Sequence, residues 1–130
     1  MSWAIDYFEQ ENGIQPAEVF EDELHRLNKR MLGKLLHIQD QLKHFGRQLG
    51  GGYIEKCHDY QGLWEIRVIH GNKLIRELCG FDGNRIILVH SYVKKVGQPA
   101  SRQDLKKAFA YWTEYLKTRL VSPPQEGNVE

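Results

Sequence analysis

The chain has 130 residues, of which 41% are hydrophobic and 27% are charged, and its formal net charge is +1 at pH 7. This size and composition predict one soluble globular domain with one core and argue against two domains. No apolar run reaches the roughly 18 residues that a membrane span needs, and the N-terminus lacks a signal-peptide pattern, so we expect a cytosolic protein with no membrane partner.

The small net charge hides an uneven distribution. Residues 1–60 carry 7 Lys and Arg against 10 Asp and Glu, a balance of −3, whereas residues 61–120 carry 11 against 5, a balance of +6. The last ten residues add −2. A basic half beside an acidic half is typical of a localised anion-binding surface, although scattered solubility charges would give the same totals.

The first predicted elements are a short strand and two helices. Alternating apolar residues in WAIDYFE (3–9) predict a half-buried strand. Asn12-Gly13 then marks a turn, and Pro16 suits the first turn of a helix. Apolar residues continue at helical spacing as far as Leu49, so we expect two helices, at about 17–30 and 33–47 with Gly33 near their junction.

The middle of the chain is predicted to be β-structure, and a helix follows it. LWEIRVI (63–69) and KLIRELCGF (73–81) flank a tight-turn triplet and predict an antiparallel hairpin. A third long strand follows, and its apolar run at 86–89 is typical of a central strand. Ser101 and Asp104 predict the N-terminal cap of the last helix. The order β-α-α-β-β-β-α indicates a single α+β domain over residues 1–120, with the helices on one face of a mainly antiparallel sheet.

The C-terminal segment and the cysteines carry fewer expectations. Residues 121–130 contain two prolines and little apolar surface, so we expect a flexible tail. Cys57 and Cys79 do not have the spacing of metal ligands, and we expect buried or idle thiols. No phosphate-binding glycine pattern, paired-histidine motif or serine-nucleophile motif occurs, so the sequence predicts no metal and no cofactor.

Basic residues on the predicted strands are candidates for binding an anion. Arg67 alternates with Trp64, Ile66 and Val68, which we expect to meet the helices, so Arg67 is predicted on the open face. Arg76 lies in the next strand, but the sequence does not reveal the hairpin register. Two opposed guanidiniums repel each other, unless a phosphate joins them.

Further candidates lie in the third strand. Lys94 and Lys95 add two ammonium groups near its end, although lysines also protect strand ends against edge pairing. His90 is a candidate proton carrier, and Tyr92 is a candidate stacking platform or hydroxyl donor. Either residue could instead belong to the core, because a single histidine in an apolar strand is commonly structural.

Together these residues resemble a known family. The segments GLWEIR (62–67), Arg76 and HSYVKK (90–95) resemble landmarks of the RelE/HigB superfamily of bacterial toxins, in particular its phage-derived Gp49-like branch. The order of helices and strands over residues 16–118 is also similar to that of the family. The sequence departs from the family pattern in Leu74-Ile75 before Arg76, in Tyr92 where Phe is common, and in VGQPAS (96–101).

The resemblance implies a RelE-like toxin of a toxin–antitoxin system. Such toxins are endoribonucleases (mRNA interferases) that cleave messenger RNA without a metal, usually on the ribosome, by attack of the ribose 2′-hydroxyl on the adjacent phosphate. By transfer from matching positions, Arg67 and Arg76 would hold the scissile phosphate, and Lys94 and Lys95 would contact phosphates or ribosomal RNA or transfer a proton. His90 and Tyr92 would be further proton-transfer candidates. The implied partner is a separately encoded antitoxin, often a helix-turn-helix protein, and the toxin itself is not expected to bind DNA.

Two alternatives stay open at this point. The first is a non-enzymatic growth inhibitor on the same fold, such as a ParE-type gyrase poison. The second is an inactive prophage relic that only binds RNA or its partner. Retention of the two arginines and two lysines favours the nuclease, because a non-enzymatic inhibitor needs no phosphate-binding cluster.

Overall fold

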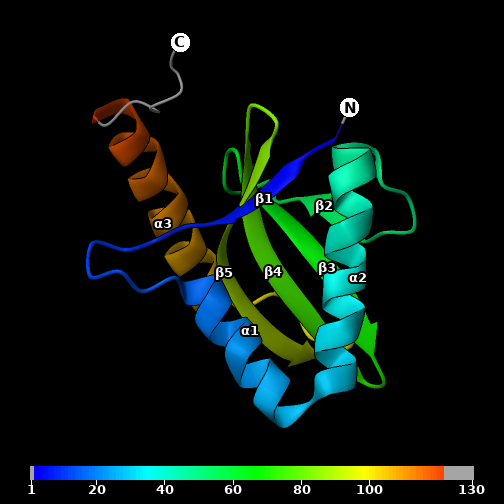
Figure 1. The fold of residues 1–130 in the computed structure, drawn as a ribbon. Helices are drawn as coiled ribbons and strands as arrows, with labels where there is room; N and C mark the ends of the chain where they lie inside the picture. Colours follow the sequence, from blue (N-terminus) through cyan, green and yellow to red (C-terminus); the bar gives the residue numbers. More distant parts are fainter. Residues whose placement is uncertain (1, 122–130) are drawn as a thin grey trace.

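The computed structural model describes residues 2–121, and it has three helices and a five-stranded sheet (Figure 1). In chain order the elements are β1 (Ala4–Tyr7), α1 (Pro16–Leu27), α2 (Lys29–Phe45), the 3-10 turn η1 (Gly46–Gln48), β2 (Ile54–Lys56), β3 (Trp64–His70), β4 (Lys73–Asp82), β5 (Arg85–Lys95) and α3 (Arg102–Val121). The strand β2 was not predicted, because three residues are too few to show an alternating pattern. A flexible tail was expected at 121–130, and all of this segment after Val121 lies outside the described residues. No described helix is both long and apolar enough to cross a membrane.

The sheet has the strand order β1-β5-β4-β3-β2. All neighbouring strands are antiparallel except β1, which runs parallel to β5 along one edge. The predicted α+β class with a mainly antiparallel sheet is therefore confirmed. The predicted hairpin is also confirmed, since β3 and β4 pair directly across the turn that follows His70.

The boundary between the two N-terminal helices lies at Asn28 rather than near Gly33. The backbone N–H of Asn28 donates to Leu24 at the end of α1, and the side-chain oxygen of Asn28 accepts from the N–H of Met31 at 3.1 Å. An asparagine in this position satisfies one of the free N–H groups that begin a helix. Gly33 lies inside α2, so the expected junction was wrong.

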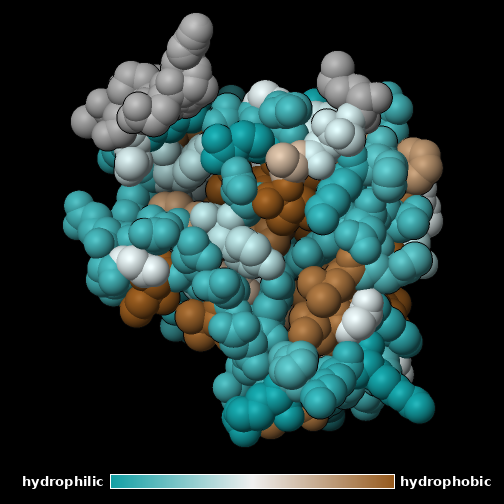
Figure 2. Space-filling view, in the orientation of Figure 1, coloured by the Kyte–Doolittle hydropathy of each residue, from teal (hydrophilic) through white to brown (hydrophobic). Residues whose placement is uncertain are grey.

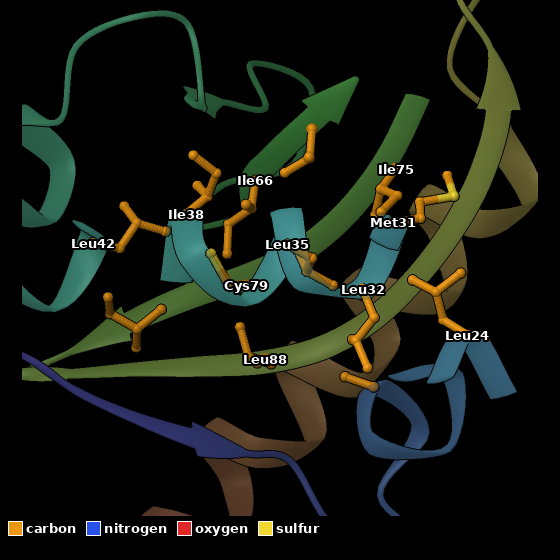
Figure 3. Close-up of a cluster of buried hydrophobic side chains, with 13 residues drawn as sticks. Leu24, Met31, Leu32, Leu35, Ile38, Leu42, Ile66, Ile75, Cys79 and Leu88 are labelled. Atoms are coloured by element: carbon orange, nitrogen blue, oxygen red, sulfur yellow. The ribbon is translucent and has the colours of Figure 1, made fainter. Parts of the chain in front are cut away.

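The helices cover both faces of the sheet, and the expectation that they share one face was also wrong. On one face, α2 buries Leu35, Ile38 and Leu42 against the sheet residues Ile66 and Ile75 (Figure 3). On the other face, the side chains of α3 pack in a second cluster, which contains Leu63, Leu78, Ala108 and Trp112. A sheet whose central strand is buried over 74–80 has apolar side chains on both faces, and each face needs a cover.

The outer surface of the helices α1 and α2 is mostly hydrophilic. Figure 2, in the same orientation as Figure 1, shows hydrophilic side chains over most of α1 and α2, with apolar surface visible between the two helices. This pattern follows from the amphipathic character of the two helices, which turn their apolar sides toward the sheet.

Candidate functional site

Three of the predicted site residues form one row across the sheet. Arg67 of β3 lies directly opposite Arg76 of β4, and Arg76 lies directly opposite Tyr92 of β5. Directly opposed residues of neighbouring strands point to the same face. The register that the sequence left open therefore brings the two arginines side by side, on the face that α3 partly covers.

A β-bulge decides which residues of β5 join this row. Residues 88–90 of β5 oppose only residues 78 and 79 of β4, so β5 carries one extra residue at this point. Before the bulge, the odd-numbered residues Ile87 and Val89 pack in the same cluster as the side chains of α3. After the bulge, an even-numbered residue, Tyr92, packs in that cluster. The bulge thus places His90, Tyr92 and Lys94 on the same face as Arg76.

The two lysines at the end of β5 are separated by strand alternation. Lys94 lies opposite Leu74, on the face of Arg76, and it is half-buried. Lys95 lies opposite Lys73 and points to the other face of the sheet. The structure therefore groups five of the six predicted site residues on one face and places Lys95 apart from them.

A buried carboxylate joins the two arginines. Nη1 of Arg76 donates to both side-chain oxygens of Glu65 at 2.8 Å, and Nε of Arg67 lies 3.5 Å from Oε1 of Glu65. Nη1 of Arg67 also lies 3.4 Å from Oε1 of Glu55. Glu65 is only 4% exposed. Its charge offsets the repulsion between the opposed guanidiniums without any bound anion.

Sequence reasoning missed Glu65 as a member of the site. The signal was present, because residues i and i+2 of a strand share a face, and Glu65 precedes Arg67 by two residues. Only the β3–β4 register reveals that the same carboxylate also reaches Arg76. Glu65 thus belongs to the cluster as a positioning group for both guanidiniums.

The cluster keeps unused donors and a net positive charge. The side chain of Arg67 is 32% exposed and that of Arg76 is 11% exposed. Within the described part of the chain, Nε of each arginine has no hydrogen-bond acceptor. Arg67, Arg76 and Lys94 oppose the carboxylates of Glu55 and Glu65, which leaves a formal charge of +1. One phosphodiester would neutralise this charge, and it would meet Arg67 first.

His90 is held by an acidic partner at the start of α3. Nε2 of His90 lies 2.7 Å from Oδ1 of Asp104, and the side chains are 13% and 29% exposed. Burial acts to raise the pKa of Asp104, but the hydrogen bonds with His90 and Ser101 outweigh it, and the pKa lies below its ordinary value. A carboxylate in this position orients the imidazole, as in other sites where histidine transfers protons.

The surroundings of Tyr92 favour the protonated form of its hydroxyl group. Its oxygen accepts a hydrogen bond from the backbone N–H of Ser101 at 3.2 Å. Burial raises the pKa of Tyr92 above its usual value, and the hydrogen bond from Ser101 only partly offsets this effect. The phenol therefore keeps its proton at neutral pH, and it can offer that proton to an anion on the same face.

The cysteines lie outside this cluster. Cys79 is fully buried and Cys57 is partly buried, and neither forms a disulfide. Burial raises the pKa of Cys57 to about 12 and that of Cys79 well above its ordinary value, so both thiols stay protonated at neutral pH. Among residues 2–121, no group of three or more His, Cys, Asp or Glu side chains is arranged to hold a metal ion.

Comparison with known proteins gives one match. Residues 22–112 match the family described as phage-derived protein Gp49-like (DUF891). The matched segment runs from within α1 to within α3, and it contains all six predicted site residues as well as Glu65 and Asp104. No curated protein and no solved structure matches the chain at a significant level.

Proposed function

The chain belongs to the Gp49-like family of phage-derived proteins, within the RelE/HigB-like toxins, and on this premise we propose that it is a toxin that cleaves messenger RNA. The family is one of toxin–antitoxin toxins, and it implies a cognate antitoxin. The finer proposal is that the toxin acts as an endoribonuclease, with the ribosome presenting the message, in the cytosol.

The observation that carries this proposal is the row of Arg67, Arg76 and Tyr92 on adjacent strands. It concentrates two guanidiniums and one protonated phenol on a face that has a residual positive charge. Guanidiniums bind phosphate oxygens through paired N–H donors, and such donors stabilise the charge that develops on a phosphoryl group during transfer.

In the proposed reaction the nucleophile belongs to the substrate. The ribose 2′-oxygen forms a bond to the adjacent phosphorus, the bond from phosphorus to the 5′-oxygen breaks, and a 2′,3′-cyclic phosphate and a 5′-hydroxyl result. The 2′-hydroxyl loses its proton to a base, and the leaving 5′-oxygen gains one from an acid. Arg67, which is the more exposed guanidinium, contacts the phosphoryl oxygens, and Arg76 adds positive charge beside it.

The proton transfers fall to the residues that flank the row. His90 is the candidate acid or base, because Asp104 holds its Nε2 and leaves Nδ1 for proton exchange. Tyr92 donates a hydrogen bond to a phosphoryl oxygen, and Lys94 contributes positive charge on the same face. Lys95 lies on the opposite face, where it would contact RNA outside the scissile phosphate.

The test combines expression with chemical analysis of the cleaved ends. The wild type and the variants Arg67→Ala and Arg76→Ala are expressed from an inducible promoter, and growth and 5′ ends of cellular messages are measured. We expect arrest and new 5′-hydroxyl ends with the wild type, and a loss of cleavage of about 100-fold or more in each variant. Arg26→Ala is the matched control, because its side chain is exposed on α1 far from the row.

Folding must be separated from chemistry in this test. Arg76 is buried with Glu65, so each variant is purified and its thermal unfolding midpoint is measured beside its cleavage rate. Arg67→Ala removes the more exposed arginine, and it is the decisive variant if Arg76→Ala unfolds. A folded Arg67→Ala protein with full cleavage would refute the proposed site.

One observation favours a second candidate, a non-enzymatic growth inhibitor on the same fold. The pair of Arg76 and Glu65 is satisfied within the protein, so the arginine has a structural role that needs no substrate. In that case the wild type arrests growth without new message ends, and DNA-damage signalling accompanies the arrest if the target is gyrase. Arrest with intact messages therefore selects this candidate over the nuclease.

A further inference from the structure

A basic pocket lies on the opposite side of β3 from β4. Its volume is about 950 Å³, and it is enclosed by α2, the loop before β2 and the end of β3. α2 contributes Arg30, Lys34 and His37, which recur at helical spacing, and β3 contributes Arg67 and His70. None of the described residues that line the pocket is acidic. A pocket with this lining attracts negative charge.

The strand that forms one wall of this pocket has a free edge. The N–H of Arg67 donates to the carbonyl oxygen of Tyr53 at 2.8 Å, and β2 gives β3 no further partner toward its end. Gly51 and Gly52 have φ angles of 84° and 77°, and these left-handed conformations turn the chain away from β3. Because N–H groups alternate along a strand, the N–H of Ile69 points to the same edge, and within residues 2–121 it has no backbone partner there.

The pocket also offers apolar surface to an extended ligand. Val68 and Ile38 line it on the face that α2 covers, and Ile69 and Leu74 line it on the other face of the sheet. Ile69 and Tyr53 are 55% and 39% exposed. Alternate side chains of an added strand point to opposite faces, so such a strand can place apolar groups against Ile69 and Leu74 and charged groups toward the cations of α2.

We propose that this pocket binds an extended acidic segment of a partner protein, which adds a strand to β3 and places carboxylates against the cations of α2. Both a peptide and a single-stranded RNA would satisfy the positive charge. Only a peptide also pairs with the free N–H and C=O groups of the edge, and this favours the peptide. That the partner is the antitoxin rests on the proposed function.

Binding at this pocket would also act on the candidate catalytic row. Arg67 lines the pocket, and it belongs to the row with Arg76. A segment bound there would lie beside Arg67, whose side chain is the more exposed of the two arginines. The pocket and the row therefore share one residue, and a partner bound in the pocket would hinder the approach of RNA to the row.

The test uses the purified full chain and a short blocked peptide that alternates valine with glutamate, measured by fluorescence anisotropy. We expect this peptide to bind, and we expect no binding of the same peptide with lysine in place of glutamate. N-methylation of alternate backbone nitrogens, which blocks strand pairing, should abolish binding. Amide exchange at Ile69 should slow when the acidic peptide is bound.

Charge reversal in the pocket provides the matched variants. Lys34→Glu should weaken binding about tenfold or more, whereas Lys117→Glu, an equal charge change on the exposed side of α3, should leave it unchanged. Failure of the peptide to bind, unchanged binding by Lys34→Glu, or equal binding of the N-methylated peptide would overturn the proposal. Oligouridine that binds with the same dependence on Lys34 and displaces the peptide would assign the pocket to RNA instead.

The outcome is independent of the nuclease test. Peptide binding needs no RNA, and Lys34→Glu changes no residue of the candidate catalytic row. If the protein binds the peptide but does not cleave messages, the docking site is supported and the proposed nuclease function is refuted. If it cleaves messages but does not bind the peptide, the nuclease function is supported and the docking site is refuted.

Discussion

The two faces of the sheet each bury a glutamate, and they neutralise it in different ways. Glu77 faces α1 and α2, and it accepts hydrogen bonds from the amide of Gln39 at 2.7 Å and the hydroxyl of Ser91 at 2.8 Å. Its nearest charged neighbour is a second carboxylate, Glu21. Glu65 faces the other side and pairs with a guanidinium, that of Arg76. Burial therefore favours the protonated form of one carboxyl, whereas an arginine compensates the charge of the other.

This difference separates a network without cations from a cluster that contains them. Burial, followed by repulsion from Glu21, raises the pKa of Glu77 well above its ordinary value, so a proton completes the network that also contains Tyr7 and Gln39. An added anion finds no cation in this network. Around Arg76, the three cationic side chains Arg67, Arg76 and Lys94 outnumber the two carboxylates of Glu55 and Glu65, and an added anion improves this balance. The comparison explains why the row around Arg76 is a candidate for binding phosphate, whereas the network around Glu77 is not.

Removing Arg76 should have the largest effect on stability. Arg76→Leu leaves the charge of Glu65 buried without its guanidinium, and breaking a buried pair in this way costs about 3–5 kcal/mol. Urea unfolding at pH 7 measures the change. The double variant Glu65→Leu with Arg76→Leu should recover most of the loss. A single variant as stable as the wild type would show that the pair contributes little on this face.

A glycine substitution tests how closely α3 packs on its face. A Cβ at Gly80 of β4 would overlap the six-membered ring of Trp112, so Gly80→Ala should destabilise the protein by about 1–3 kcal/mol. Gly33→Ala on α2 is the contrasting control, because its Cβ meets no atom within 4 Å and alanine favours a helix, and it should stabilise by up to about 1 kcal/mol. If Gly80→Ala and Gly33→Ala shift the thermal unfolding midpoint equally, the close packing of α3 on Gly80 is contradicted.

The protonated carboxyl predicts a pH dependence of stability. The folded-state pKa of Glu77 is raised, so its contribution is fully present below the unfolded value of 4.5 and is lost as the pH rises through the folded value. Within this window the slope is about 1.4 kcal/mol per pH unit. Glu77→Gln keeps the hydrogen-bonding shape without the titration. As the pH rises above 5, its unfolding free energy should therefore fall less than that of the wild type, by at most about this slope.

The control for this measurement is Glu23→Gln, which changes an exposed carboxylate on α1. Its unfolding free energy should follow the pH dependence of the wild type. If Glu77→Gln also follows the wild type, Glu77 is ionised in the folded protein, and the contrast between the two faces disappears.

The smallest expected effect concerns the cap that begins α3. Oγ of Ser101 accepts from the N–H of Asp104 at 3.2 Å, which confirms the predicted cap. Ser101→Ala should cost about 1 kcal/mol in urea unfolding, and Ser101→Asp should keep most of the stability because aspartate also caps helices. An alanine variant with unchanged stability would show that packing against the sheet, rather than the cap, holds this end of α3.

Much of the fold could be predicted from the sequence, because helical and alternating spacings are local properties of the backbone. Alternation placed Arg67 opposite to the core residues Ile66 and Val68, and the structure confirms this. The hairpin of β3 and β4 followed from its turn, and the cap at Ser101 followed from its residue types. The short strand β2 and the helix junction at Asn28 were missed, since weak or very short patterns leave little local signal.

Tertiary structure decided everything that depends on contacts between distant residues. The opposition of Arg67 and Arg76 is a matter of strand register, and a shift of one residue would have separated them onto different faces. The bulge in β5 set the face of His90, the position of α3 set its partner Asp104, and the pairing of Glu65 followed from both register and burial. Local spacing specifies which side chains share a strand face, but only long-range packing specifies which of them meet.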